Sequence, residues 1–436
     1  MTPEVKQRIE QIRQGIVPEG YKKTKSGILP ENWSVRTIAE CLERVEHPVE
    51  VQANEMYTQI GIRSHGKGLF YKEPVTGDSL GNKAVFWIEP DCFILNIVFA
   101  WEQAIGKTTQ AEAGMIGSHR FPMYHPINGS IDIDYLISYL LTKRGTDILE
   151  AASPGGAGRN RTLGQDRFMK SRIVLPPLDE QKKIAQILAT QDRAIELQGR
   201  KIEELKRFKQ GCLERMFPRE GQKVPEKRFP GFTGDWEQRK VPELLKNTSD
   251  AIKIGPFGSA LKKSFFTDKG IKVYAQENAF TGDFSIGNYY ISEEKYNELK
   301  SCELKPGDLV ISMMGTVGAC AIFPENAEEG IMNSHLLRLQ FSEEVLPEYI
   351  MFLLRDSQII RDQIDRLSVG SIMTGLSSTV VKKLVFPVPK RPEQQKIVEL
   401  LKLLDNLITL HQCKLEEMKK QKKALMQLLL TGIVRV

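Results

Sequence analysis

A long internal repeat limits the folds open to this chain more than any other feature of the sequence. Residues 180–217 align without a gap with residues 393–430 at an offset of 213, and thirteen of the aligned positions are identical. The identical pairs are Glu180/Glu393, Gln181/Gln394, Lys183/Lys396, Ile184/Ile397, Leu188/Leu401, Asp192/Asp405, Ile195/Ile408, Leu197/Leu410, Lys201/Lys414, Glu203/Glu416, Glu204/Glu417, Lys206/Lys419 and Lys209/Lys422. A repeat of this length predicts two related structural units rather than one continuous domain.

The similarity extends upstream of the repeated segment. Each copy follows an apolar, strand-like run that ends in prolines, Ile173–Pro177 in the first half and Leu384–Pro389 in the second. Because proline ends the strand, each long helix is predicted to begin just after it. Further upstream, Trp33–Glu40 resembles Trp236–Glu243. The predicted fold class is therefore α/β, with two similar globular domains of roughly 150 residues, each followed by a long helix.

The predicted organisation divides the chain into five parts. These are an N-terminal helix and connector at 1–20, a first globular domain at 21–177, a central long helix at 178–217, a connector with the second globular domain at 218–390, and a C-terminal long helix at 391–436. Residues 430–434 resemble residues 15–17, so the two ends of the chain are expected to meet. The whole would then be a circular arrangement with pseudo-two-fold symmetry.

Both predicted long helices carry apolar residues at heptad spacing. This seam comprises Ile184, Leu188, Ile195, Ile202 and Leu205 in the first copy and Ile397, Leu401, Ile408, Leu415 and Met418 in the second. Such a pattern is typical of a coiled coil, in which polar seam residues such as Gln191, Gln198 and His411 fix the register. The chain has one such pair of helices, so we expect them to pair with each other. The globular domain between them requires an antiparallel return, and about 38 residues would make a rod near 57 Å long.

The composition excludes several classes of protein. Hydrophobic residues make up 41% of the chain and charged residues 27%, which is close to the average for a globular protein. The longest apolar stretch, residues 93–101, is too short to span a bilayer, and the N-terminus does not resemble a secretory signal, so a cytoplasmic location is expected. The six cysteines form no Cys-x-x-Cys pair and are expected to be reduced thiols. The net charge of +6 is modest, which predicts local basic patches rather than a generally basic surface.

A search for catalytic motifs gives no convincing candidate. Residues 101–108 end like a phosphate-binding loop, but Trp101 replaces the first glycine of the motif. His119 and His125 have no third ligand at a suitable spacing, which favours structural histidines over a metal site. Motifs of methyl-donor sites and of metal-dependent nucleases are not recognisable either. We therefore expect neither a catalytic residue nor a metal site in this chain.

Two polar, glycine-containing loops lie at matching positions in the two halves. In the first half the loop at 155–162 includes Arg159, Asn160, Arg161 and Thr162, and its counterpart at 368–374 includes Ser371 and Thr374. Glycine lets backbone amides approach a phosphate closely, and arginine matches phosphate or the guanine edge. Each loop is therefore a candidate for binding nucleic acid, with an ordinary solvated loop as the alternative.

A second pair of candidate loops is basic. The loop at 254–259 is flanked by Lys253, Lys262 and Lys263, and the loop at 63–68 is its predicted counterpart in the first half. The basic residues of that counterpart are Arg63, His65 and Lys67. An ordinary hairpin turn is an equally good interpretation of either loop. Three amide side chains could pair with adenine: Gln276, Asn278 and Asn333. Local hydrogen bonding is the favoured interpretation of each.

Several of these motifs together resemble a known family. They are the duplicated Pro-Pro-Leu-x-Glu-Gln-x-x-Ile run at 176–184, the turn Leu304–Asp308, the loop Gly255–Leu261 and the terminal Leu430–Gly432. In this combination, and over essentially the whole chain, they resemble the specificity subunit of type I restriction-modification enzymes.

The resemblance implies how such a chain works. The two globular domains would be target-recognition domains, each reading one half of a bipartite, asymmetric sequence in double-stranded DNA, and the helices would set the distance between the half-sites. The subunit would dock two methyltransferase subunits, which bring S-adenosylmethionine, and indirectly restriction subunits that translocate DNA with ATP and Mg²⁺. No cofactor would be bound by this chain itself.

The residues and the resemblance lead to one hypothesis and two alternatives. The hypothesis is a non-catalytic subunit that reads a DNA sequence and provides a platform for assembly. An alternative from another class is a coiled-coil scaffold that joins two protein partners without touching DNA. A self-contained methyltransferase or nuclease is disfavoured because its motifs are not found.

Overall fold

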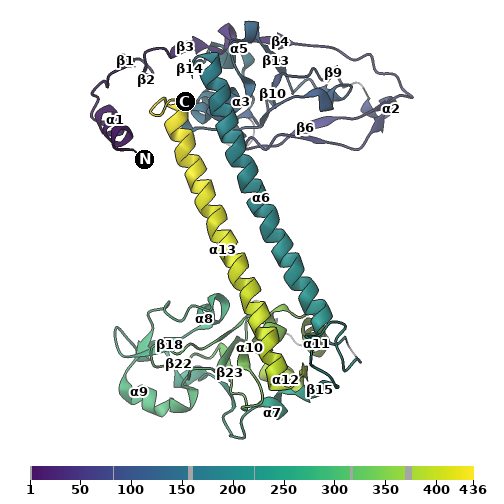
Figure 1. Cartoon of the computed structure of the whole chain (residues 1–436), viewed down its shortest axis with the longest axis vertical. Coiled ribbons are helices and arrows are strands. Elements are labelled where there is room, and N and C mark those ends of the chain that lie inside the picture. The colour runs from purple at the N-terminus through teal and green to yellow at the C-terminus, as the bar shows by residue number, and fades with distance from the viewer. Residues whose placement is uncertain (1, 82, 156–160, 220, 315–317, 369–375) are drawn as a thin grey trace. The chain divides into compact units, whose positions relative to one another are not determined.

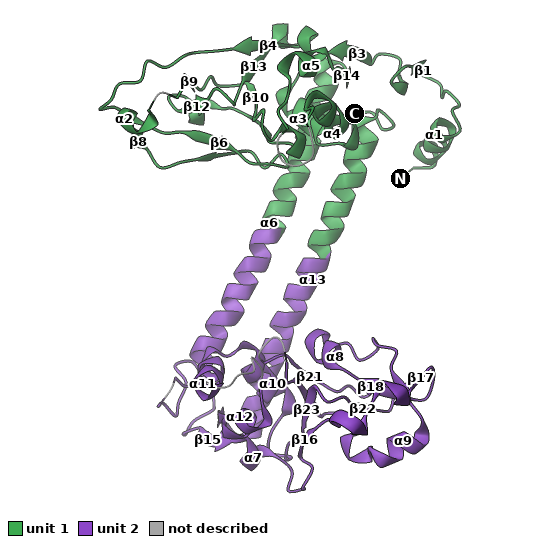
Figure 2. Ribbon diagram, turned by 180° about the vertical axis from the view of Figure 1, so that it is seen from behind, with its two compact units in different colours: residues 1–198, 414–436 green, residues 199–413 purple. Residues whose placement is uncertain are grey.

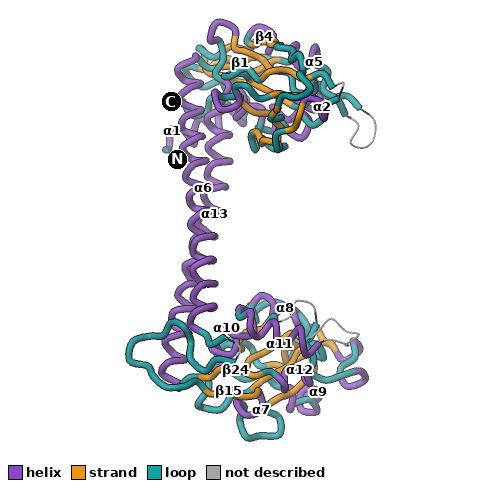
Figure 3. The backbone as a smooth tube through the Cα atoms, turned by 90° about the vertical axis from the view of Figure 1, so that its right-hand side faces the viewer, coloured by secondary structure: helices purple, strands orange, loops and turns teal. Residues whose placement is uncertain are grey.

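The computed structural model describes residues 2–81, 83–155, 161–219, 221–314, 318–368 and 376–436. It divides into two compact units, residues 1–198 with 414–436 and residues 199–413 (Figure 2). The division cuts both long helices, so each unit holds one globular domain with the adjoining part of each helix. Strands and helices occur in both units, which gives each the mixed α/β character expected from the sequence (Figure 3).

The first unit begins with a short helix and continues through many short strands before its helices (Figure 1). Its strands are β1 (Tyr21–Thr24), β2 (Gly27–Pro30), β3 (Ser34–Thr37), β4 (Leu42–Val45), β5 (Met56–Tyr57), β6 (Ile60–Ile62), β7 (Leu69–Tyr71), β8 (Val75–Thr76), β9 (Val85–Trp87), β10 (Phe93–Leu95), β11 (Ile105–Lys107), β12 (Ile116–Ser118), β13 (Met123–Pro126) and β14 (Arg172–Leu175). Its helices are α1 (Pro3–Arg13), α2 (Gly77–Leu80), α3 (Ile133–Leu140), α4 (Lys143–Ala152), α5 (Gln165–Lys170) and the start of α6 (Leu178–Met216).

The second unit has a similar sequence of elements. Its strands are β15 (Glu237–Lys240), β16 (Ile252–Ile254), β17 (Phe266–Thr267), β18 (Ile271–Tyr274), β19 (Tyr290–Ile291), β20 (Leu309–Ser312), β21 (Cys320–Ile322), β22 (Gly330–Met332), β23 (Leu336–Leu339) and β24 (Val385–Val388). Its helices are α7 (Val241–Leu244), α8 (Gln276–Thr281), α9 (Glu293–Glu298), α10 (Pro347–Asp356), α11 (Gln358–Ser368), α12 (Ser378–Lys383) and the start of α13 (Arg391–Leu430).

The two domains share one sheet topology. In the first domain a four-stranded sheet has the order β11-β10-β13-β4, and the second domain repeats it as β21-β20-β23-β16. Outside this sheet, β3 pairs antiparallel with β14, and β15 pairs in the same way with β24. These two pairings explain the sequence similarity between the segments that begin at Trp33 and Trp236. Each segment leads into the strand that pairs with the proline-ended strand of its domain.

The repeated Glu-Gln dipeptide makes the same contacts in both units. Gln181 accepts a hydrogen bond from the backbone of Asp132 and donates one to Pro176, at 2.9 Å each. Gln394 likewise accepts from Leu346 at 2.8 Å and donates to Pro389 at 2.9 Å. These buried amides fasten the first turn of each long helix to the domain before it.

The glutamates of the same dipeptide form buried ion pairs. Arg435 makes two hydrogen bonds to Glu180, at 2.6 and 2.8 Å, and the indole of Trp33 donates a third at 3.1 Å. In the second unit Arg228 makes two hydrogen bonds to Glu393, at 2.6 and 2.7 Å. Each ion pair raises the pKa of its guanidinium, chiefly through the hydrogen bond to the glutamate.

The two ends of the chain meet in the first unit, as the sequence predicts. Arg8 on α1 donates a hydrogen bond to the carbonyl of Ile433, and Tyr21 donates one to Gly432, each at 2.7 Å. Together with the Arg435 ion pair, these contacts hold the C-terminal residues against the first domain.

The long helices pair with each other within each unit. In the first unit Asp192 of α6 bonds Lys422 of α13, and in the second Lys209 of α6 bonds Asp405 of α13 at 2.6 Å. These are reciprocal copies of one contact, because Asp192 repeats as Asp405 and Lys209 repeats as Lys422. Since Glu180, near the start of α6, bonds Arg435, beyond the end of α13, the helices run antiparallel in the first unit.

The predicted seam residues lie on the covered side of the two helices. The buried ones are Ile184, Leu188, Ile202, Ile397 and Leu401, and the half-buried ones are Ile195, Leu205, Ile408, Leu415 and Met418. No helix in the described ranges is long and apolar enough to cross a membrane.

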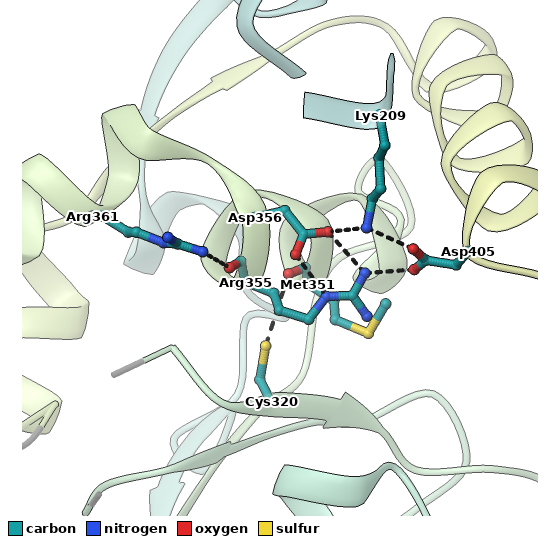
Figure 4. A network of polar contacts seen from close by, with 7 residues as sticks. All are labelled: Lys209, Cys320, Met351, Arg355, Asp356, Arg361 and Asp405. Atoms are coloured by element: carbon teal, nitrogen blue, oxygen red, sulfur yellow. Dashed lines mark hydrogen bonds and ion pairs between the residues drawn. The ribbon is translucent and has the colours of Figure 1, made fainter. Parts of the chain in front are cut away.

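In the second unit the contact of Lys209 with Asp405 belongs to a larger polar network. Lys209 bonds Asp356 as well as Asp405, at 2.6 Å each, and Arg355 bonds both carboxylates (Figure 4). Burial alone would raise the pKa of Asp356, but the hydrogen bonds and charges of Arg355 and Lys209 outweigh it and lower that pKa. The network fixes the end of α10 to both long helices of the second unit.

Candidate nucleic-acid interface

The first domain has a pocket with a volume of about 800 Å³, lined by residues at the ends of several strands. We call it the first-domain cleft. Its lining residues are Gln59, Ile60, Lys72, Lys83, Ala84, Val85, Asn96, Val98, Phe99, Ser118, His119, Arg120 and Phe121.

Backbone hydrogen bonds bring these distant parts of the sequence together. Strand β12 pairs with β9, which places Ser118 opposite Val85, and the amide of His119 then donates to Ala84 at 3.3 Å. The amide of Lys72 donates to Gln59 at 2.9 Å just beyond the β6–β7 ladder. The cleft is therefore built from strand ends, which hold its side chains on a stable frame.

The chemistry of the cleft suits nucleic acid. Lys72, Lys83 and Arg120 are exposed, and none of them forms an ion pair within the described ranges. No carboxylate lines the cleft among the residues that the structure describes. Unpaired lysine and arginine can neutralise phosphates, and the amide of Gln59 has the donors and acceptors that read base edges. Asn96 is buried, and its side chain accepts a hydrogen bond from the amide of Val98 at 3.0 Å.

Two of the predicted residues of the first domain, His65 and Arg161, contact residues 97–103, a segment that also contributes to this cleft. The guanidinium of Arg161 lies over the ring of Trp101, 5.3 Å from its centroid. The loop at 63–68 is the hairpin between β6 and β7, and the amide of His65 donates to the carbonyl of Glu102 at 2.8 Å. Val98 and Phe99 of the same segment line the cleft. The structure thus brings Arg161 and the hairpin at 63–68 against one segment of the first domain.

Some side chains of these loops have partners within the domain, and others are exposed. Arg63 donates a hydrogen bond to the carbonyl of Leu69 and lies over Phe70, so its guanidinium is engaged within the hairpin. Lys67 and Thr162 are exposed. Arg159, Asn160, Ser371 and Thr374, which the sequence also singles out, lie outside the described residues.

The basic loop of the second domain follows β16. Lys253 lies on this strand opposite Arg338, and Lys262 and Lys263 are exposed beyond the loop. Gly255 is required by its surroundings, since an added Cβ would lie 1.8 Å from the carbonyl oxygen of Asn333. Phe257 at the loop tip is 61% exposed, which leaves an aromatic ring beside the two lysines.

The loop at 63–68, proposed from the sequence as a rough functional counterpart of this loop, is not its topological counterpart. Strand β16 occupies the place of β4 in the repeated sheet, so the topological counterpart of the loop follows Val45. Residues 63–68 join β6 to β7, which pair only with each other as a two-stranded sheet. Similar composition, with glycines beside basic residues, suggested the match.

Two of the three candidate amides, Asn278 and Asn333, have local partners, as favoured from the sequence. Asn278 is buried, accepts from Ala275 at 2.9 Å and donates to Asp283 at 2.9 Å. The side chain of Asn333 accepts from the amide of His335 at 3.0 Å. These contacts account for both amides without a base.

The second domain also has a large concave surface, of about 900 Å³, but with different chemistry. It is lined by Arg355, Asp356 and Arg361 together with small residues and Phe280. The charges of Arg355 and Asp356 are already used in the network of Figure 4, and Arg361 donates to the carbonyl of Arg355 at 2.7 Å. The concave surfaces of the two domains are therefore not equivalent.

Sequence reasoning missed the cations of the first-domain cleft. Lys72, Lys83 and Arg120 are spread over nearly fifty residues and belong to no motif. The one local signal is the run Ser118–Phe121, whose start matches Ser334–His335 in the repeat. Only strand pairing shows that these residues share one surface.

The comparisons with known proteins agree with this arrangement. A family model described as the type I restriction modification DNA specificity domain matches residues 86–207 and 235–420, more than half of the chain. The chain belongs to this family of specificity subunits. The resemblance expected from the sequence is thereby confirmed, and the two matched stretches correspond to the two repeated domains.

Individual relatives of this specificity subunit match over nearly its full length. It is 25% identical to the type I restriction enzyme MjaVIII specificity subunit of Methanocaldococcus jannaschii, over 98% of both chains. A chain from a structural study of complex assembly and conformational transition of the type I R-M system matches 93% of it with a TM-score of 0.57 at 16% identity. The HsdS subunit from Thermoanaerobacter tengcongensis also matches 93% of it, with a TM-score of 0.50 at 18% identity. These likenesses confirm the expected fold of two repeated α/β domains with a long helix between them in the sequence.

Proposed function

We propose that this chain is the subunit that selects the DNA sequence in a type I restriction-modification enzyme. Each globular domain reads one half of a bipartite, asymmetric target, and the chain itself has no catalytic site. The observation that carries the proposal is the first-domain cleft, where three exposed cations and the half-buried amide of Gln59 line a concave surface and no carboxylate is present among the described lining residues.

Different residue types of the cleft have different roles in binding DNA. Lys72, Lys83 and Arg120 contact phosphates and fix the position of the domain on the duplex. Such contacts carry no sequence information, so other residues must read the bases. Gln59, which lines the cleft and is half-buried, is suited to hydrogen bonding with base edges. Arg161, over Trp101, would extend the basic surface beside residues 97–103.

The difference between the two domains fits an asymmetric target. The sheets have the same topology, but the concave surface of the second domain contains an internally paired network, whereas its loop after β16 is followed by the exposed side chains of Lys262 and Lys263. Two domains with one fold and different surfaces would read two different half-sites.

The paired long helices serve as the spacer. Helix length fixes the distance between half-sites when two reading elements are joined rigidly, as it does for dimeric DNA readers. The exposed faces of these helices would also dock two methyltransferase subunits. S-adenosylmethionine, and ATP with Mg²⁺ for any restriction subunits, would be bound by these partners and not by this chain.

A methylation map tests the reading function. The chain is co-expressed with a methyltransferase subunit, and modified sites are compared for the native chain and for Lys72→Ala/Arg120→Ala. We expect the variant to bind DNA more weakly and to methylate its sites less completely, without a change in the sequence of those sites, because phosphate contacts carry no sequence information. The matched control Lys23→Ala/Lys25→Ala removes two exposed lysines outside the cleft and should keep the native map. Unchanged affinity and extent of methylation in the cleft variant would count against the assignment.

A second experiment tests the spacer. Inserting the same number of helical turns into α6 and α13 should lengthen the gap between the methylated half-sites without changing either half-site. An unaltered gap would contradict the role of the helices, while leaving the reading function of the domains in place.

A further inference from the structure

The repeated sheet gives the first-domain cleft a structural counterpart in the second domain. In the first domain the amide of Ile97, just after β10, donates to the carbonyl of Arg120, just before β13, at 3.0 Å. In the second domain the amide of Met313, just after β20, donates to the carbonyl of His335, just before β23, at 2.9 Å. Because β10 and β13 correspond to β20 and β23 in the repeated topology, these are two copies of one hydrogen bond.

This correspondence shows which side chains replace those of the cleft. His335 takes the structural position of Arg120, and both side chains are exposed. Met314, the residue after Met313, takes the position of Val98, which lines the cleft. The side chain of Met314 is 49% exposed. The second domain thus presents a large apolar side chain beside an imidazole where the first domain presents valine beside arginine.

The loop after β16 reaches the same edge of the sheet. The amide of Gly255 donates to the carbonyl of Leu336, at the start of β23, at 3.0 Å. Since the strand order is β16-β23-β20, the loops that carry Phe257 and Met314 begin on either side of β23, two strand spacings or about 10 Å apart. We call residues 255–258, 313–314 and 333–335 the β23 edge.

Exposure alone would not single out the apolar residues of the β23 edge. Single exposed apolar side chains are common on protein surfaces and need no explanation. Phe257 and Met314, however, both lie at the edge that corresponds to the proposed DNA-binding cleft of the first domain. The loops that carry them leave the sheet directly after hydrogen bonds to the start of β23, which fixes where each loop begins.

We propose that the second domain reads its half-site with the β23 edge, and that Phe257 and Met314 recognise the methyl groups of thymine in the major groove. The inference rests on the proposed function of the chain as a DNA-reading subunit. Neither side chain has a strong hydrogen-bond donor or acceptor, so the feature of a base edge that matches them is the C5-methyl group of thymine. The exposed His335 contacts the DNA backbone, as Arg120 does in the first domain. The two domains therefore read their half-sites with different chemistry.

Replacing thymine by deoxyuridine tests the proposal, because it removes only the methyl group. The complex of the full chain with its methyltransferase subunits is titrated by fluorescence anisotropy with duplexes that carry the mapped target. Uracil replaces every thymine of one half-site at a time. We expect uracil in one half-site to weaken binding about fourfold for each contacted methyl group. In Phe257→Ser/Met314→Ser that replacement should have no further effect.

A matched control removes two exposed apolar side chains of the second unit outside the β23 edge. Val224 lies in the connector, and Phe280 lines the larger pocket of the second domain. Val224→Ser/Phe280→Ser should bind like the native chain and keep the full effect of uracil. The proposal is overturned if uracil binds like thymine at both half-sites of the native chain, if Phe257→Ser/Met314→Ser keeps the uracil effect, or if the control variant loses it.

The inference and the proposed function can fail separately. If the chain does not select a DNA sequence, the methylation map contains no bipartite target, and the proposed function fails. If the map shows a bipartite target but uracil binds like thymine in both half-sites, only the role of the β23 edge fails.

Discussion

The two buried ion pairs of the repeated Glu-Gln dipeptide predict unequal effects for one and the same substitution. Arg228→Met and Arg435→Met each remove a guanidinium that makes two hydrogen bonds to a glutamate. The two glutamates differ in what remains after the arginine is gone. We expect Arg228→Met to be the more destabilising of the two.

The magnitudes follow from burial and from the remaining partners. The side chain of Glu393 is 1% exposed, and Arg228 provides both of its charge-assisted hydrogen bonds, so its loss leaves a buried, unpaired carboxylate at a cost of about 3–5 kcal/mol. Glu180 keeps the indole of Trp33 at 3.1 Å, and Arg435 is itself 37% exposed. The cost of Arg435→Met should therefore be about 1–2 kcal/mol.

Hydrogen exchange followed by mass spectrometry measures this difference, because peptides report on each unit separately. Protection of peptides from residues 236–254 should fall in Arg228→Met, and protection of peptides from residues 21–45 should fall less in Arg435→Met. The double variant Arg228→Met/Glu393→Gln removes the unpaired charge and should recover part of the loss. Equal losses in the two single variants, or no recovery in the double variant, would refute the reasoning.

Three further predictions concern acid stability, salt dependence and the basic loop of the second domain. The lowered pKa of Asp356 means that its stabilising contribution is present at neutral pH and lost as the pH falls below about 4, so Asp356→Asn should flatten the acid side of a urea-unfolding series. Lys72→Ala and Arg120→Ala should each reduce the salt slope of DNA binding by about 1, measured by fluorescence anisotropy. Gly255→Ala places a Cβ against the carbonyl of Asn333 and should destabilise the second unit by about 1–3 kcal/mol in thermal unfolding.

Much of the fold could be predicted because it depends on local pattern. The proline-ended runs gave the start of both long helices to within a few residues, and the heptad seam gave their covered faces. The pairing of β3 with β14 and of β15 with β24 was not predicted, although the matching segments at Trp33 and Trp236 pointed to it. The sequence could not show that the loop at 63–68 differs in topology from the loop after β16, because composition carries no information about strand order.

The candidate site was less accessible to sequence reasoning. Glycine-rich and basic loops such as the one after β16 are visible as short runs. The first-domain cleft is not, because its cations come from separate strand ends and each of them alone resembles an ordinary surface residue.

The sequence by itself determined the duplication, the helices with their seam, and the family, since these depend on residue order at fixed spacing. The tertiary structure alone decided how many carboxylates each cation contacts. Lys209 and Lys422 are the same residue of the repeat, yet Lys209 bonds two carboxylates and Lys422 bonds one. The number of partners depends on how α10 or α3 ends beside the long helices, which is a matter of packing in space rather than of spacing along the chain.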